Sequence, residues 1–157
     1  MESQEISKNP AVVKLKAWNS STVAEVIEFR DETTVVVPRE HLLSVAEFLA
    51  TSSLHFSFLS DISAVDRFPL EPRFEVNYHL LSIERRARLR VKVKLPGNDA
   101  VLHSVTPVWP GANWHEREMY DLFGIQFEGH PDLRRILMPD DWEGYPLRKD
   151  YPTEGNR

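Results

Sequence analysis

Two stretches of alternating side chains, residues 74–81 and 89–95, constrain the fold of this chain more than any other feature. Apolar residues occupy every second position: Phe74, Val76, Tyr78 and Leu80 in the first stretch, and Leu89, Val91, Val93 and Leu95 in the second. Successive side chains of a strand point to opposite faces, so this alternation predicts two strands with one face on a core. The short connection SIERRA between them predicts a β-hairpin.

The second face of the later strand carries three cations, Arg90, Lys92 and Lys94. One interpretation is an anion-binding stripe. The alternative is a solvated sheet face whose charges resist pairing with other strand edges. We favour the solvated face, because charged residues on the outer side of a sheet are common.

The segments before residue 74 complete an α+β pattern. Residues 10–18 predict a short helix with proline at its start. Residues 22–29 and 33–37 are rich in Val, Ile and Thr and predict a hairpin. Apolar residues at positions i, i+3, i+4 and i+7 between Leu42 and Leu49 predict a helix with one buried face. With a strand in residues 55–66, we expect a small mixed or antiparallel sheet of four to five strands and one long packed helix.

A second helix is predicted from Gly111 to Tyr120. Asn113 is a candidate N-cap, and Gly124 suits the left-handed conformation that ends helices. Arg117 and Asp121 lie four residues apart and therefore share a helix face.

Beyond Glu128 the periodicities stop and prolines recur every six to eight residues. We therefore expect an α+β core domain in residues 1–127 and an extended Pro-rich C-terminal arm in residues 128–157. The arm nevertheless contains large apolar side chains: Leu133, Ile136, Leu137, Met138, Trp142, Tyr145, Leu147 and Tyr151. This favours an arm that docks on another protein, with an arm folded back over its own sheet as the alternative.

Composition excludes several classes of function. The net charge of −5 provides no excess of Lys and Arg for nucleic acid. No apolar run approaches the roughly 18 residues needed to span a bilayer. The opening MESQEISKNP lacks the basic and apolar parts of a signal peptide, which predicts a cytoplasmic setting. The absence of cysteine excludes disulfides, thiolate nucleophiles and Cys-ligated zinc or iron–sulfur clusters.

The sequence indicates no catalytic or cofactor site. It contains no Gly-rich phosphate loop and no nucleophile elbow. The fragment HEREM resembles the start of a zinc motif, but Met119 stands where the second histidine is required. The six histidines have no short metal-ligand spacing, so we expect no bound metal.

Three carboxylates, Glu116, Glu118 and Asp121, allow two interpretations. They could act as general acids or bases, which requires shifted pKa values. Alternatively, they form ion pairs with arginines that attach the arm to the helix, which would lower their pKa values. The candidate arginines are Arg117, Arg134 and Arg135. We favour the structural interpretation.

The stretch NWHEREMYDLFGIQFEGHPDLRRILMPDDWEGYPLRKDYP, residues 113–152, closely resembles the signature region of the 30-kDa subunit family of complex I, whose bacterial members are known as the C subunit. Upstream, FLSDISAVDR, FEVNYHLLSI, LRVKVKL and SVTPVWPGANW resemble the preceding strands and connection. The resemblance covers about three quarters of the chain, far beyond a short motif.

The resemblance implies a cofactor-free structural subunit in the hydrophilic arm of a proton-translocating NADH:quinone oxidoreductase. FMN, the iron–sulfur clusters and quinone would belong to partner subunits. The main implied partner is the D subunit, a large protein that forms much of the quinone pocket. The B and I subunits are further implied neighbours, and no nucleic acid is implied. The absence of a fused domain of the D type and of a presequence implies a bacterial protein, peripheral to the cytoplasmic side of the inner membrane.

Carried onto this sequence, the family motif gives a set of candidate interface residues. They are Trp114, Glu116, Arg117, Glu118, Tyr120, Asp121, Gly124, His130, Pro131, Arg134, Arg135, Trp142, Pro146, Leu147, Arg148, Lys149, Asp150 and Tyr151.

Two alternatives to this function remain. The chain could be the equivalent subunit of a related energy-converting hydrogenase or dehydrogenase complex. It could also be an independent enzyme that uses the carboxylates of the second helix.

Overall fold

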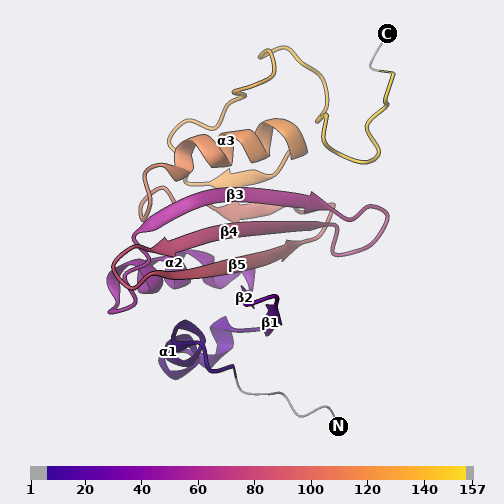
Figure 1. Cartoon of the computed structure of the whole chain (residues 1–157). Helices are drawn as coiled ribbons and strands as arrows, with labels where there is room; N and C mark the ends of the chain where they lie inside the picture. The colour runs from indigo at the N-terminus through magenta and orange to yellow at the C-terminus, as the bar shows by residue number, and fades with distance from the viewer. Residues whose placement is uncertain (1–6, 155–157) are drawn as a thin grey trace.

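The computed structural model describes residues 7–154 and contains three α-helices and seven strands in that range (Figure 1). The elements in chain order are α1 (Pro10–Trp18), η1 (Ser20–Thr22), β1 (Glu25–Phe29), β2 (Glu32–Val36), η2 (Arg39–His41), α2 (Leu42–Thr51), β3 (Phe58–Asp66), β4 (Phe74–Ser82), β5 (Ala87–Leu95), β6 (Val101–His103), α3 (Ala112–Phe123) and β7 (Gln126–Glu128). The predicted α+β class is confirmed.

The main sheet has five strands in the order β1-β2-β5-β4-β3. Its β1–β2, β5–β4 and β4–β3 pairs are antiparallel, whereas β2 and β5 are parallel. The sheet is therefore mixed, as expected, and both predicted hairpins form. The sequence did not predict the second, two-stranded sheet of parallel β6 and β7. With three residues each, these strands are too short to show a period-two pattern.

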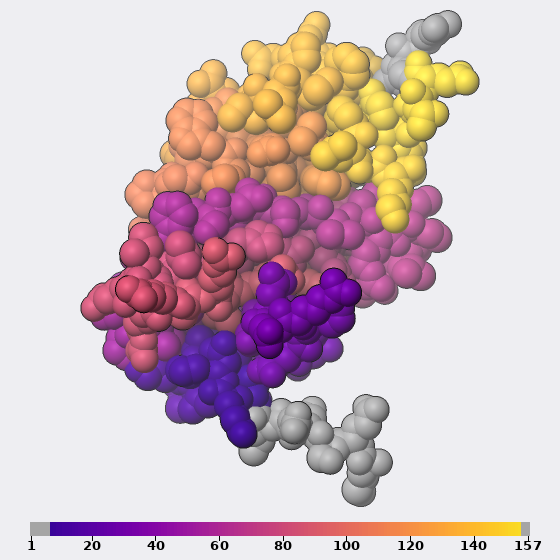
Figure 2. Space-filling view, viewed as in Figure 1, coloured from indigo at the N-terminus to yellow at the C-terminus, as the bar shows by residue number. Residues whose placement is uncertain are grey.

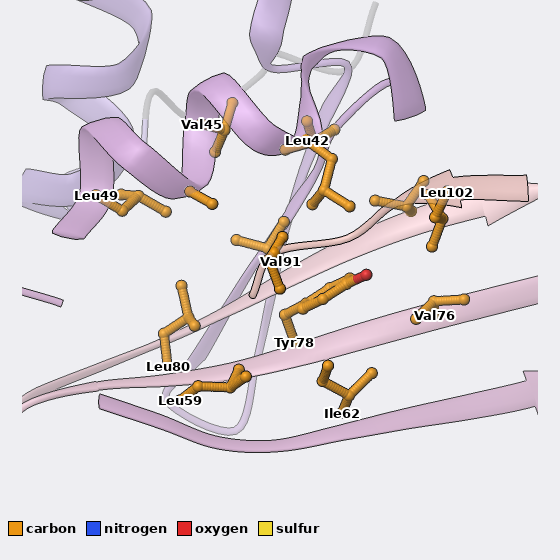
Figure 3. Close-up of a cluster of buried hydrophobic side chains, with 14 of the residues drawn as sticks. Leu42, Val45, Leu49, Leu59, Ile62, Val76, Tyr78, Leu80, Val91 and Leu102 are labelled. Carbon is orange, nitrogen blue, oxygen red and sulfur yellow. The ribbon is translucent and has the colours of Figure 1, made fainter. Parts of the chain in front are cut away.

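The hydrophobic core joins the main sheet to α1 and α2, and it extends to α3 and the small β6–β7 sheet. The predicted apolar stripe of α2 is confirmed, because its four buried residues are Leu42, Val45, Ala46 and Leu49. Figure 3 shows Leu42, Val45 and Leu49 above Val91 and Tyr78 of the sheet. Burying one such aliphatic side chain contributes about 1.5–3 kcal/mol.

The three cations of β5 each meet a carboxylate on the outer face of the sheet. Arg90 lies 2.9 Å from Glu32, Lys92 lies 3.2 Å from Glu75, and Lys94 lies 3.6 Å from Glu25. This cross-strand pairing neutralises the stripe, so the anion-binding interpretation has no support. The three cations are half-buried, so the favoured prediction of a solvated face holds only in part.

The start of α3 differs from the prediction. The helix begins at Ala112 after the N-cap residue Gly111, and Asn113 lies inside it. The chain already turns before Asn113, since its N–H donates to the Pro110 carbonyl at 3.2 Å. Asn113 therefore has no extended backbone from which to cap the helix. The helix continues past the predicted Tyr120 to Phe123, and the predicted role of Gly124 is confirmed: it is left-handed, with φ 75°, and donates to the Tyr120 carbonyl.

The C-terminal segment, residues 129–154, contains no helix or strand in the part that the structure describes. It passes over α3 and then beside β3, at the opposite end of the molecule from α1 (Figures 1 and 2). No helix within residues 7–154 combines the length and apolarity needed to cross a bilayer.

Candidate functional site

Helix α3 is unusual because it buries charged side chains. Glu116 and Asp121 have no exposed surface, and Arg117 is 8% exposed. A buried charge is stable only where ion pairs or hydrogen bonds replace its lost hydration. The partners of these three side chains therefore define the candidate site.

Asp121 binds the C-terminal segment through both carboxylate oxygens. Its Oδ2 accepts hydrogen bonds from the backbone N–H groups of Ile136, Leu137 and Met138, at 3.2, 2.7 and 2.9 Å. Its Oδ1 lies 2.8 Å from Nη1 of Arg135. Burial acts to raise the pKa of Asp121, but these bonds outweigh it and hold the pKa below its usual range.

Arg135 connects the turn of the C-terminal segment to α3. Besides its ion pair, its guanidinium donates to the carbonyls of Asp121, Trp142 and Gly144 at 2.8–2.9 Å. It also lies 5.2 Å from the ring of Tyr145. One guanidinium thus fixes two separate parts of the segment, a use that depends on its several rigid donors.

The predicted ion pairs of the other two arginines do not form. Arg117 donates instead to the carbonyls of Arg134 and Arg135, at 3.1 and 3.0 Å. Arg134 pairs with Asp132 at 2.8 Å on the surface, 66% exposed. Only Arg135 forms the expected pair with α3. Asp121 is the carboxylate of α3 that pairs with an arginine, and Arg135 occupies it. The groups of the segment that lie near Arg117 are the backbone carbonyls of Arg134 and Arg135.

Glu116 also departs from the prediction of an ion-paired carboxylate. Its oxygens accept hydrogen bonds from Ser104 Oγ and the Val105 N–H, both at 2.7 Å. Within residues 7–154 no arginine pairs with it, and Nε2 of His130 lies 3.9 Å from its Oε2 atom. Burial raises the pKa of Glu116 to about 7, with the two hydrogen bonds acting in the opposite direction. Because its side chain is fully enclosed, Glu116 cannot reach an external substrate as an acid or base.

Glycine at position 124 allows the segment to return to the end of α3. A Cβ at this position would lie 2.6 Å from the ring of Tyr145 and 2.7 Å from Nη2 of Arg148. Arg148 donates through Nε to the Phe123 carbonyl at 2.6 Å, and the Leu147 N–H donates to the Leu122 carbonyl at 3.0 Å. The last carbonyls of α3 thus receive donors from the segment.

A further attachment lies at the end of β3. Asp66 accepts two hydrogen bonds from the guanidinium of Arg73, at 2.8 and 2.9 Å, and one from the Lys149 N–H at 2.8 Å. Arg73 also lies 2.7 Å from Asp150. The Arg73 guanidinium, together with the bonds from Lys149 and Phe68, holds the pKa of Asp66 far below its usual range.

Sequence reasoning missed Asp66 and Arg73. Their partners lie 83 and 77 residues away, and no local pattern signals such a pairing. The same arginine lowers the pKa of Asp150.

Some of the large apolar side chains of this region point outward, whereas others, such as Leu133, Met138 and Tyr145, are half-buried. The large ones left exposed on α3 and the C-terminal segment are Trp114 (59%), Ile136 (37%), Leu137 (63%), Trp142 (39%) and Leu147 (53%). They form the set that we call the exposed apolar residues. The polar groups of the C-terminal segment thus bind its own domain, while these five side chains remain exposed.

The candidate interface residues fall into three groups by exposure. Glu116, Arg117, Asp121 and Gly124 are buried and have structural roles: Glu116 holds the connection before α3, and the other three position the C-terminal segment. Glu118, Tyr120, His130, Arg135, Pro146, Arg148 and Tyr151 are half-buried. The exposed residues, which are free to touch another protein, are Trp114, Pro131, Arg134, Trp142, Leu147, Lys149 and Asp150.

The buried residues of the site position parts of the chain, and its exposed residues form an open surface. Within residues 7–154 no group of three His, Cys, Asp or Glu side chains could hold a metal ion. The buried charged groups of α3 are bound by the chain itself, while large apolar side chains are exposed. Fold and site together define a class: an α+β domain that binds its own C-terminal segment through polar groups and leaves several large apolar side chains of that segment exposed.

Comparison with known proteins gives the family. Residues 35–157 match the family described as the 30-kDa subunit of respiratory-chain NADH dehydrogenase. The C subunit of the NADH-quinone oxidoreductase of Geobacter sulfurreducens is 51% identical over 148 residues, covering 94% of this chain and 91% of that protein. The chain therefore belongs to the 30-kDa subunit family of complex I.

Two solved structures share the fold. A trypsin-resistant fragment of the protein Nqo5 is 36% identical, with a TM-score of 0.66, over 77% of this chain and 97% of the fragment. A chain of the membrane-bound sulfane sulfur reductase, an archaeal respiratory membrane complex, is 28% identical with a TM-score of 0.77. That match covers 94% of this chain and 87% of the archaeal one.

Proposed function

We propose that this chain works as the C subunit of a bacterial NADH-quinone oxidoreductase, where it is a cofactor-free structural part of the hydrophilic arm. In this role it docks on the D subunit, with the B and I subunits as further neighbours. It thereby supports electron transfer from NADH to quinone and the coupled pumping of protons. FMN, iron–sulfur clusters and quinone reside in partner subunits, and the chain meets the cytoplasmic side of the inner membrane only through the complex.

One observation carries this proposal: the exposed apolar residues sit on a segment whose polar groups are bound to its own domain. Asp121 and Arg135 fix the turn that presents Leu137, and the end of α3 fixes the turn that presents Leu147. Water is an unfavourable neighbour for such side chains, and burial of each contributes about 1.5–3 kcal/mol. A partner with an apolar surface, as proposed for the D subunit, would supply that burial.

We propose the division of the chain on the same grounds. Residues 1–127 would form a core domain and residues 128–157 a docking arm. Deletion of residues 129–157 should leave the core folded and abolish assembly. The solved Nqo5 chain is a trypsin-resistant fragment of that protein, which supports a core that is stable without its remainder.

The decisive experiment replaces two exposed apolar residues, Leu137→Ser and Leu147→Ser, in a tagged chain. We expect wild-type folding of the isolated variant by circular dichroism, and loss of the D subunit from the material purified from gently solubilised membranes. Ile83→Ser is the matched control, because Ile83 is 66% exposed in the β4–β5 turn. Wild-type recovery of the D subunit and of NADH:quinone activity with the double variant would refute the docking surface.

A second function is favoured by the archaeal comparison. The sulfane sulfur reductase chain shares this fold over most of its length, so the fold serves more than one respiratory complex. The chain could therefore be the equivalent subunit of a related energy-converting hydrogenase or dehydrogenase complex. Mass spectrometry of the purified assembly separates the two functions, because only the first assembly contains an NADH-oxidising module and reduces quinone with NADH.

A further inference from the structure

Among the strands of residues 7–154, β6 pairs with β7 alone, so its second edge is free. The hydrogen bonds to β7 all lie on the first edge of β6. At its two ends, the Gln126 N–H donates to the Ala100 carbonyl at 2.9 Å, and the Ser104 N–H donates to the Glu128 carbonyl at 2.7 Å. Backbone groups alternate in direction along a strand, so those of Val101 and His103 point away from β7. A free edge is a template for the addition of another strand.

A groove of about 630 Å³ borders this edge and is closed on its other side by η2 and α2. Val101 and His103 line it together with half-buried Leu43 of α2. One end is fixed by Arg39, which pairs with Asp99 at 2.6 Å and donates to its carbonyl at 2.8 Å. The free edge of β6 therefore faces a groove in which Leu43 provides an apolar contact.

The rim of the groove is acidic. Glu40, Glu47 and Glu128 line it, all three are exposed, and none forms an ion pair within residues 7–154. The single arginine of the lining is already paired with Asp99. Carboxylates around a strand edge favour an added segment that carries Lys or Arg and disfavour an acidic one.

We propose that this groove binds a short, extended, basic segment of a partner protein, which pairs with the free edge of β6. Backbone bonds to Val101 and His103 hold the segment in register, and alternate basic side chains meet the three glutamates. The groove shares no residue with the exposed apolar residues. It is therefore a second contact surface, which can exist whether or not the C-terminal segment docks on the D subunit.

The first test uses the full-length chain and a synthetic probe, an N-acetylated nonapeptide of alternating lysine and valine with an amidated end. We expect binding that weakens with salt, with the peptide protecting the amides of Val101 and His103 from hydrogen exchange. A nonapeptide of alternating glutamate and valine is the control and should not bind. Protection elsewhere, or equal binding of both peptides, would overturn the proposal.

The second test replaces the rim. Glu40→Gln, Glu47→Gln and Glu128→Gln should each weaken the lysine–valine peptide about two- to fivefold, as expected for exposed ion pairs. Glu143→Gln, at an exposed position of the C-terminal segment, is the matched control and should have no effect. A triple variant that binds the peptide as wild type does would contradict the assignment of the rim.

The third test uses the assembled complex. With p-benzoylphenylalanine in place of Leu43, irradiation should cross-link the chain to a stretch of a partner protein that contains Lys or Arg. The same substitution at Ile83 is the control. A complex that assembles and is active but yields no cross-link from Leu43 would overturn this inference and leave the proposed function intact. Failure of the wild-type chain to enter a complex would refute the proposed function instead.

Discussion

The main sheet and the C-terminal segment place their side chains in opposite ways. In the sheet, apolar residues such as Tyr78 and Val91 are buried, and cations such as Lys94 face outward. In the C-terminal segment, Arg135 turns inward to a buried carboxylate, while Leu137 is 63% exposed. The sheet is therefore stabilised mainly by hydrophobic burial. The segment is held by directional polar bonds and leaves large apolar side chains exposed.

The two kinds of attachment should fail differently. Hydrophobic burial is spread over many contacts, so one substitution weakens the whole core. The polar attachment is concentrated in a few groups, so one substitution should release the segment while the core persists. Substitutions in both regions can test this difference.

Asp121→Ala should have the largest effect. It leaves the Arg135 cation without its counter-ion and three backbone N–H groups without their acceptor, and breaking a buried pair in this way costs about 3–5 kcal/mol. We expect the amides of Leu137 and Met138 to lose their protection in hydrogen-exchange mass spectrometry. The amides of β4 should keep theirs. Simultaneous loss of protection in β4 would show that segment and sheet unfold as one unit.

Leu49→Ala should have the opposite result: it should weaken the core and leave the polar attachment of the segment intact. Leu49 is fully buried in α2, and truncation of such a side chain costs about 2–5 kcal/mol of the free energy of unfolding. Leu147→Ala is the matched change in the segment, where the side chain is 53% exposed, and should alter the stability of the free chain by less than about 0.5 kcal/mol. Chemical denaturation of both variants measures the contrast. Equal destabilisation would contradict the assignment of Leu147 to a partner surface.

Sequence patterns predicted the sheet better than the segment, for a physical reason. The spacing of apolar residues from Leu42 to Leu49 directly reports a buried helix face, and the alternation in β4 and β5 reports a half-buried hairpin. Both are local signals that hydrophobic burial imposes. They were sufficient for the fold class, for α2 and for the hairpins.

The attachment of the segment has no local signal. Asp66 and Lys149 are 83 residues apart, and nothing near either one reveals the bond between them. The charged residues of α3 did indicate that the segment is attached to this helix, but the sequence predicted their individual partners only in part. Asp121 and Arg135 pair as predicted, whereas Glu116 is buried among neutral donors. Which of two neighbouring carboxylates meets a cation depends on tertiary packing that the spacing of residues does not specify.

Glu116 also makes a prediction about pH. Its pKa rises from an ordinary value of 4.5 to about 7 on folding, chiefly through burial. Between these pH values the unfolded chain has lost this proton and the folded chain retains it, so this group lowers the free energy of unfolding as pH rises from 4.5 to 7. The full effect is at most about 3 kcal/mol. Above pH 7 the contribution is constant.

The variant Glu116→Gln isolates this contribution, because glutamine has nearly the same size and shape as glutamate and cannot ionise. Relative to wild type, the variant should become more stable as pH rises from 4.5 to 7, measured by urea denaturation at each pH. Asp66, Asp121 and Asp150 have lowered pKa values and act in the opposite direction at lower pH, but they are common to both proteins. Parallel stability curves for the two proteins would show that Glu116 is ionised in the native state.

The smallest effect is expected on the outer face of the sheet. Lys94 lies 3.6 Å from Glu25, and both side chains are partly exposed, so this pair should contribute at most about 1 kcal/mol. Lys94→Gln should therefore leave denaturation nearly unchanged and add to the effect of Leu49→Ala without coupling. A loss similar to that of Asp121→Ala would mean that the charges of this face are as structural as those of α3. The contrast between the regions would then lie in hydrophobic exposure alone, because polar bonds would hold both of them.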